Sequence, residues 1–280
     1  MDLIHTIAEL RARLKGVGTV ALVPTMGNLH AGHLSLIEIA RARGECVVAS
    51  IFVNRLQFEP GGDFDRYPRT LPRDCEMLAR AGCDVVFAPD EAELYPQAQE
   101  VRVTPPDVGA ALEGEHRKGH FEGVATVVSK LFNIVRPDVG VFGKKDYQQL
   151  QVIRALVRQL DFPVEIVGGE TVREPDGLAM SSRNGYLDAE ERVEAVRLSR
   201  NLKHIRRAIE GGSRDFPRLI ESATADLSSH GWKVDYIAIR SRDRLAPPTP
   251  DDRALVVLGA AWLGRTRLID NLEIDAPATP

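Results

Sequence analysis

Short apolar runs alternate with helix-like stretches through the first 170 residues of this 280-residue chain. Residues 46–53 (CVVASIFV) are apolar almost throughout, which is typical of strands in parallel sheets that helices cover on both faces. The alternation predicts βαβ units with ligands beyond the carboxyl ends of the strands. Strands are expected at residues 17–23, 46–53, 84–88, 139–142 and 164–167, and helices at residues 34–43, 71–81, 121–135 and 146–160.

The pattern changes after about residue 175, where two polar helices precede further strands. We therefore predict an α/β fold with a Rossmann-like parallel-sheet domain at residues 1–174 and a smaller α+β domain at residues 175–280. Residues 276–280 are expected to form a loose tail. In the smaller domain, helices are expected at residues 189–210 and 215–229, and strands at residues 234–239, 254–258 and 268–274.

Composition restricts the class of protein. A content of 44% apolar and 27% charged residues is typical of a globular chain, and a net charge of −4 argues against non-specific nucleic-acid binding. No apolar run approaches the roughly 20 residues that span a bilayer, and residues 1–5 do not resemble the start of a signal peptide. Cys46, Cys75 and Cys83 are scattered, which indicates buried thiols of a cytoplasmic protein.

The segment PTMGNLHAGH, residues 24–33, directly follows the first of these strands. Its glycines let the backbone approach a ligand closely, and the helix that follows begins with unpaired N–H groups that attract phosphate. His30 and His33 lie on the same side of that helix start and can donate to phosphate oxygens. The segment therefore predicts a nucleotide triphosphate site.

The two histidines could instead bind a metal ion or form a structural pair. A metalloprotease helix has Glu directly after its first histidine, whereas Ala31 follows His30 here. No cysteine is close enough in sequence to complete a local zinc site. Phosphate binding is favoured, and the other two interpretations stay open.

Three more polar clusters lie at strand ends or in turns. Asn54 and Gln57 follow residues 46–53 and could bind hydroxyl or carboxylate groups, although they would also suit a solvated loop. Residues 143–149 (GKKDYQQ) repeat the arrangement of strand end, glycine and helix start. Residues 178–184 (LAMSSRN) place serine hydroxyls beside an arginine, which suits a phosphate clamp or a solvated turn.

Together these segments resemble the pantothenate synthetase (pantoate–β-alanine ligase) family of the His-x-Gly-His nucleotidyltransferase-like superfamily. The His-x-Gly-His motif alone is shared with aminoacyl-tRNA synthetases and cytidylyltransferases, so the later motifs make the resemblance specific. It covers residues 19–271, with the motifs PTMGNLHAGH (24–33), SIFVN and QF (50–58), DFDRYPRT (63–70), LEG and GHFEGV (112–124), FGKKDYQQ (142–149), REPDGLAMSSRN (173–184) and RLIDN (267–271).

The resemblance implies a cytoplasmic homodimer with a lid-like C-terminal domain, acting on small molecules rather than on nucleic acid or membranes. It implies that the pantoate carboxylate attacks the α-phosphorus of ATP, which releases pyrophosphate and forms pantoyl adenylate. The amine of β-alanine then attacks the acyl carbon and releases AMP and pantothenate. Mg²⁺ would be carried by ATP, with no direct metal ligand from the protein.

The resemblance also implies residue roles. Gln57 and Gln149 would bind pantoate, and Gln57 and Asn54 would contact β-alanine. The catalytic groups would be His33 (the proton donor), His30 and Lys145. ATP would be bound by Met26, Gly27, Asn28, Leu29, His30, Ala31, Gly32, His33, Gly143, Lys144, Lys145, Asp146, Val172, Met180, Ser181, Ser182 and Arg183.

Two residues depart from the family pattern. Arg55 stands where proline is general, and Lys144 where glutamate is common. The first adds a cation beside the expected pantoate pocket, and the second reverses a charge beside the expected ATP site. Altered specificity and lineage drift both explain such changes.

Two other functions compete with the ligase. A nucleotidyltransferase that stops after transfer would have no small acid for Gln57 and Gln149 to bind. A catalytically idle nucleotide-binding module would have no need for the histidine pair together with Lys145 and Arg183, because clustered charged groups cost stability.

Overall fold

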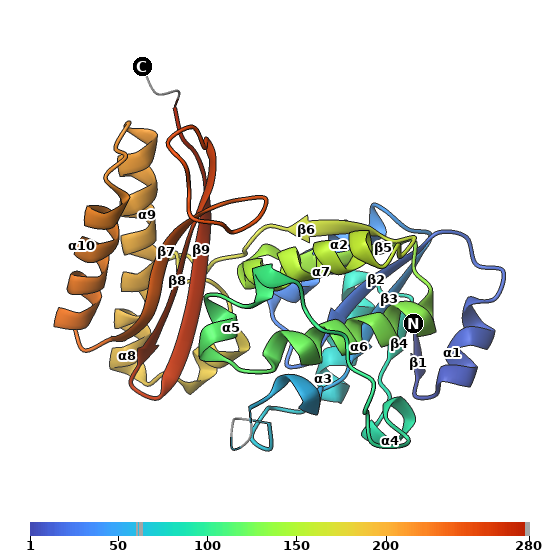
Figure 1. Cartoon of the computed structure of the whole chain (residues 1–280). Helices are drawn as coiled ribbons and strands as arrows, with labels where there is room; N and C mark the ends of the chain where they lie inside the picture. Colours follow the sequence, from blue (N-terminus) through green and yellow to red (C-terminus); the bar gives the residue numbers. More distant parts are fainter. Residues whose placement is uncertain (60, 62–63, 278–280) are drawn as a thin grey trace. The chain divides into compact units, whose positions relative to one another are not determined.

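The computed structural model describes residues 1–59, 61 and 64–277. Asp63 of the DFDRYPRT motif and residues 278–280 of the expected tail lie outside the described residues. The chain forms two compact units (Figure 1): unit 1 is Met1–Lys144 with Gln149–Glu170, and unit 2 is Lys145–Gln148 with Thr171–Pro280. The division into domains at residues 174 and 175 stays a prediction.

Unit 1 contains a six-stranded sheet in the order β1-β4-β3-β2-β5-β6, and its paired strands run parallel. The predicted α/β fold class is confirmed. The chain places β3 and β4 on one side of β2 and then β5 and β6 on the other, so the strand order reverses between β2 and β5, where doubly wound sheets bind ligands. The strands are β1 (Asp2–Ile4), β2 (Val20–Thr25), β3 (Cys46–Ile51), β4 (Val85–Phe87), β5 (Val139–Gly143) and β6 (Glu165–Gly169).

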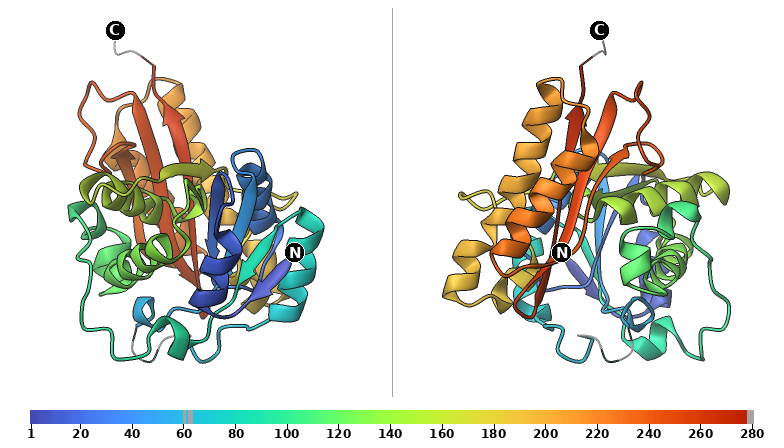
Figure 2. Two further views of the ribbon diagram at one scale, coloured as in Figure 1. Left: turned by 90° about the vertical axis from the view of Figure 1, so that its right-hand side faces the viewer. Right: turned by 60° about the vertical axis from the view of Figure 1, so that its left-hand side comes forward.

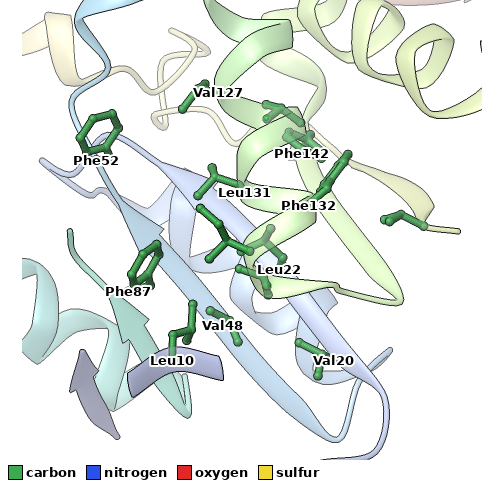
Figure 3. Packing of buried hydrophobic residues seen from close by; sticks show 14 of the residues in the cluster. Leu10, Val20, Leu22, Val48, Phe52, Phe87, Val127, Leu131, Phe132 and Phe142 are labelled. Carbon is green, nitrogen blue, oxygen red and sulfur yellow. The ribbon is translucent and has the colours of Figure 1, made fainter. Parts of the chain in front are cut away.

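Helices cover both faces of this sheet. Val20 and Leu22 of β2 join the hydrophobic cluster that contains α1, α6 and α7 (Figure 3), whereas Ala21 and Val23 join the cluster that contains α2 and α3. Burial on both faces explains why the strands are apolar at nearly every position. The helices are α1 (Ile7–Leu14), α2 (Ala31–Arg41), α3 (Leu71–Ala81), α4 (Glu91–Leu94), α5 (Glu113–His116), α6 (His120–Val135) and α7 (Tyr147–Gln159), with 3₁₀ turns η1 (Arg55–Gln57), η2 (Asp107–Gly109) and η3 (Lys144–Asp146).

Several elements of unit 1 differ from the sequence-based expectation: helices α1, α4 and α5 were not expected, and β2 covers Val20–Thr25 rather than residues 17–23. Helix α2 begins at Ala31 rather than residue 34, which places His33 in its first turn. The expected helix at residues 146–160 begins as the 3₁₀ turn η3 before α7. Strand β1 was not anticipated, because three residues show no periodicity and become a strand only by pairing with β4.

Unit 2 contains an antiparallel sheet of β7 (Lys233–Ser241), β8 (Ala254–Leu263) and β9 (Thr266–Asp275). Helices α9 (Val196–Glu210) and α10 (Phe216–Ser229) cover one face of it (Figure 2). Gly264, with a φ of 55°, and Arg265 form the two-residue turn between β8 and β9. The helix expected at residues 189–210 is interrupted at Ala195, which separates α8 (Ala189–Glu194) from α9, and η4 (Ser182–Tyr186) precedes it.

Two further expectations need correction. The peptide N–H of Ala276 donates to the carbonyl of Arg253 at 2.8 Å, and the carbonyl of Pro277 accepts from Arg214, so these two residues are not a loose tail.

Cys46 and Cys83 are buried thiols as expected, and burial raises the pKa of Cys83 to about 11, but Cys75 is only half-buried. No helix within residues 1–59, 61 and 64–277 is long and apolar enough to cross a membrane.

Candidate active site

His30 and His33 form a capping box at the start of α2. Nδ1 of His30 accepts the peptide N–H of Gly32 at 3.1 Å, and Nδ1 of His33 accepts that of His30 at 3.3 Å. The ring centroids are 4.1 Å apart. Because a peptide N–H only donates, each Nδ1 presents its lone pair, and a neutral ring therefore carries its proton on Nε2. The cap thus selects the tautomer whose Nε2–H groups can donate to an anion.

The loop that precedes α2 is held by Asp74 of α3. This buried carboxylate accepts the peptide N–H of Asn28 and of Leu29, each at 2.9 Å, and the hydroxyl of Thr70 at 3.0 Å. A Cβ added to Gly27, whose φ is 80°, would lie 3.0 Å from Asp74 Oδ2. Two N–H groups of the predicted ATP loop therefore bind a carboxylate of the protein.

Asn54 and Gln57 form one hydrogen-bonded cluster after β3. Asn54 is 1% exposed, and its Nδ2 donates to Gln57 Oε1 at 3.1 Å and to the Gly123 carbonyl at 3.2 Å. Its Oδ1 accepts the Tyr95 hydroxyl at 2.9 Å. Gln57 Nε2 lies 3.3 Å from the sulfur of Met26, so the fold brings the second polar cluster to the predicted ATP loop.

The backbone of Gln57 is held by His120 at the start of α6. Nδ1 of His120 is 2.9 Å from the Gln57 carbonyl, and its Nε2 is 3.1 Å from Nη1 of Arg117. Because a guanidinium only donates, Nε2 accepts and Nδ1–H donates to the carbonyl. His120 of the GHFEGV motif thus positions the segment that is predicted to bind the acid substrate.

Gly123 lets α6 approach η1 closely. A Cβ at this position would lie 2.3 Å from the Leu56 carbonyl oxygen and 2.6 Å from the peptide nitrogen of Gln57. Both atoms belong to the backbone, so a larger residue would have to displace the turn that carries Gln57.

Both residues that depart from the family pattern have acidic partners. Arg55 pairs with Glu91 at 3.1 Å and places its guanidinium carbon 3.9 Å from the ring centroid of Phe64. Lys144 pairs with Glu170, and its side chain is 18% exposed. The positive charge of Arg55, expected beside the pantoate pocket, is therefore balanced by Glu91. The positive charge of Lys144 is balanced in the same way by Glu170.

In unit 2, strand β9 holds two of the predicted ATP-binding segments. Arg173 forms a bidentate ion pair with Asp270, at 2.8 and 2.9 Å, and also donates to the carbonyl of Asn271 at 3.2 Å. The side-chain amide of Asn271 donates to the carbonyl of Lys145 at 2.8 Å. The RLIDN motif on β9 thus binds two segments to one strand. One segment contains Lys145 and Asp146, and the other is the chain around residue 173.

The serine-arginine turn is organised by its own hydrogen bonds. The peptide N–H of Met180 donates to the carbonyl of Val172 at 3.0 Å. Ser181 is the N-cap of η4, and its hydroxyl oxygen accepts the peptide N–H of Arg183 at 3.2 Å. Unit 2 therefore gathers Val172 with the residues from Met180 to Arg183, while Gly143, Lys144 and Gln149 belong to unit 1.

Sequence reasoning assigned no role to several residues that hold the site. Asp74 had a detectable signal, because a carboxylate stands between Leu71 and Leu78 on the apolar stripe of α3. The others depend on contacts between segments distant in sequence. They are Tyr95, Arg117, His120, Arg173 and Asp270. Within the part of the chain that the structure describes, no group of three or more His, Cys, Asp or Glu side chains could hold a metal ion.

Replacing Asp74 with alanine should weaken ATP binding about tenfold or more, because hydrogen bonds to a charged group contribute about 1.5–3 kcal/mol each. Calorimetric titration with ATP measures the effect. Glu76→Ala is the matched control, since it removes an exposed carboxylate from the same helix. Unchanged ATP affinity in Asp74→Ala would show that the loop keeps its conformation without the carboxylate.

Gly123→Ala should weaken pantoate binding, because the added methyl group would displace the turn that carries Gln57. A displacement of about 1 Å can cost on the order of 100-fold in activity. Ser129→Ala on the same helix is the control, since its buried hydroxyl has no partner among the described residues. Steady-state kinetics with varied pantoate distinguishes the two variants. Equal pantoate KM values in Gly123→Ala and wild type would contradict the close-packing argument.

Comparison with known proteins identifies the family. The profile of the family described as pantoate-β-alanine ligase matches residues 2–273. The pantothenate synthetase of Nitrosospira multiformis is 60% identical over 274 residues, covering 98% of each chain, and that of Thiobacillus denitrificans is 59% identical, covering 99% of each.

Solved structures show the same fold. Pantothenate synthetase from Thermus thermophilus superposes with a TM-score of 0.92 at 47% identity, covering 98% of this chain and 99% of that one. Pantoate-β-alanine ligase from Francisella tularensis, complexed with β-γ ATP and β-alanine, gives a TM-score of 0.81 at 32% identity, covering 98% of this chain and 97% of that one. Sequence and fold agree, and the chain belongs to the pantoate–β-alanine ligase family.

Proposed function

We propose that this chain condenses pantoate with β-alanine to give pantothenate, using ATP. A pantoate carboxylate oxygen attacks the α-phosphorus of ATP and pyrophosphate leaves. The β-alanine amine then attacks the acyl carbon of pantoyl adenylate, and AMP leaves. Family membership supports this reaction, as does the Francisella tularensis relative that was solved with β-γ ATP and β-alanine.

The histidine capping box is the observation that carries the proposal. Charge develops on the phosphate oxygens as the carboxylate attacks and pyrophosphate departs. Donors that are already oriented stabilise such charge without reorganisation during the step. The cap orients the Nε2–H groups of His30 and His33 in advance, at a helix N-terminus that itself favours anions.

Other residues are also proposed to bind the nucleotide. Lys145 would place a cation at the phosphates and act as the third catalytic group, and Arg183 would use its planar fork for phosphate oxygens. The remaining ATP contacts would come from Met26, Gly27, Asn28, Leu29, Ala31, Gly32, Gly143, Lys144, Asp146, Val172, Met180, Ser181 and Ser182. For Asn28 and Leu29 the contacts would come from other atoms than their peptide N–H groups, which bind Asp74.

The acid substrates are assigned to the amide cluster. Gln57 and Gln149 would hold pantoate, and Gln57 with Asn54 would meet β-alanine. For Asn54 this role is indirect at most in the conformation described, because its amide already bonds Gln57, Gly123 and Tyr95.

We also propose that the chain forms a homodimer and uses Mg²⁺. Mg²⁺ would enter as part of the MgATP substrate, because triphosphate oxygens are ligands that this ion prefers. Resemblance to the family supports a homodimer acting in the cytoplasm, and light scattering of the purified chain tests the dimer.

Product analysis tests the reaction. Incubation with MgATP, pantoate and β-alanine should give pantothenate, AMP and pyrophosphate in equal amounts. ADP with inorganic phosphate would rule out an adenylate. Pyrophosphate release with a stable nucleotide adduct and no amide would favour the nucleotidyltransferase alternative.

Two variants of His33 separate its capping role from its role toward phosphate. In His33→Asn the short amide can still accept the peptide N–H of His30 but cannot reach the position of Nε2. We expect the adenylation rate to fall about 10²–10³-fold while thermal stability is nearly kept. His33→Gln places an N–H donor near the Nε2 position, so its rate should fall less.

Single-turnover formation of pantoyl adenylate measures both rates. If His33→Asn retained adenylation within about threefold of wild type, Nε2 would have no part in stabilising the phosphate charge.

A further inference from the structure

We propose that Tyr95 is a positioning residue for the acid substrate: it holds in place the Asn54 amide, whose polarity the backbone fixes, so that Gln57 presents N–H donors to a carboxylate. The inference rests on the proposed function, in which Gln57 binds pantoate. It adds a residue and a direction of hydrogen bonding to that assignment.

The orientation of the Asn54 amide is determined by two backbone groups. The carbonyl of Gly123 can only accept, so the nitrogen of Asn54 faces it at 3.2 Å. The peptide N–H of Leu56 can only donate, and it lies 3.4 Å from Asn54 Oδ1. A flipped amide would oppose like groups at both positions. Asn54 therefore donates to Gln57 and accepts from Tyr95.

This orientation passes to Gln57. Its Oε1 accepts from Asn54 at 3.1 Å, so Nε2 must occupy the other side of the amide. Nε2 lies 3.3 Å from the sulfur of Met26, and a thioether is a weak acceptor that a carboxylate can replace. The amide of an unrestrained glutamine has two orientations. In one of them its oxygen faces the acid and repels the carboxylate oxygens. Fixing the amide removes the unfavourable flip.

Tyr95 completes the cluster. Its hydroxyl donates to Asn54 Oδ1 at 2.9 Å, which is a shorter hydrogen bond to that oxygen than the one from Leu56. Burial raises the pKa of Tyr95, so the hydroxyl keeps its proton and remains a donor. The ring packs edge-on against Phe52 with centroids 5.8 Å apart, and Lys130 Nζ lies 4.9 Å from its centroid. The ring can therefore stay in place when only the hydroxyl is removed.

Tyr95→Phe tests the proposal. The KM for pantoate should rise about tenfold, the scale of one hydrogen bond between buried groups, whereas the KM for ATP and kcat should stay within about twofold of wild type. Thr126→Val is the control, because it removes a buried hydroxyl that accepts the peptide N–H of Val103 in the same unit. The control should lower the melting temperature without a selective change in the KM for pantoate.

A double-mutant cycle separates positioning from a merely structural role. If Tyr95 acts through Gln57, adding Tyr95→Phe to Gln57→Ala should change the pantoate Kd, measured by calorimetry, by less than about twofold. Independent, additive effects would overturn the proposal, as would equal losses toward pantoate and ATP. A wild-type chain that makes no pantothenate would instead refute the proposed function.

If Tyr95→Phe does not fold, Asn54→Asp provides the second test. Aspartate keeps both acceptor contacts but loses the donor, so it should attract Gln57 Nε2 and turn Oε1 toward the substrate. The same selective rise in the KM for pantoate is expected. An unchanged pantoate KM in that variant would overturn the proposal.

Discussion

Two peptide N–H groups at the start of α2 donate to imidazole nitrogens, where hydroxyl or carboxylate oxygens are the usual N-cap acceptors. The cap satisfies the helix end and determines which nitrogen of each ring carries the proton. Asp74 holds the loop before the cap, and Met26 of that loop touches Gln57. The proposed phosphate and acid contacts of unit 1 thus depend on one short connection between β2 and α2.

The same physical rule recurs around the site. A peptide N–H or a guanidinium always donates a hydrogen bond, and a peptide carbonyl always accepts one. Each of these groups therefore selects one of the two flips of a neighbouring amide, or one of the two tautomers of a neighbouring imidazole. Gly123 and Leu56 do this for Asn54, and Arg117 does it for His120. The backbone thereby determines the polarity of the amide at Gln57 and the tautomer at each capping histidine.

The sequence predicts the parts of the fold that repeat along the chain. The strands of unit 1 are apolar in sequence because both faces of the sheet are buried. The motif at residues 24–33 could be placed at the end of a strand because an apolar run precedes it. Strand β1 and the residues Tyr95 and His120 could not be predicted in the same way, because their roles arise only from pairing with distant segments. The family resemblance supplied the substrates, and composition alone did not.

The effect of Arg55 and Lys144 also depends on distant partners. In the sequence each is an added cation, yet each has an exposed or partly exposed acidic partner, Glu91 or Glu170. Exposed ion pairs contribute little to stability, about 0–1 kcal/mol, but they cancel charge locally. The structure therefore favours lineage drift over altered specificity at both positions.

Transfer of oxygen from substrate to nucleotide tests most directly whether the pantoate carboxylate attacks the α-phosphorus of ATP. Pantoate labelled with ¹⁸O in both carboxylate oxygens is incubated with MgATP and β-alanine, and AMP is analysed by mass spectrometry. We expect one ¹⁸O in each AMP, because the acyl–oxygen bond breaks when the amine attacks, and one ¹⁸O retained in the amide of pantothenate. Unlabelled AMP, or label in inorganic phosphate released with ADP, would contradict it.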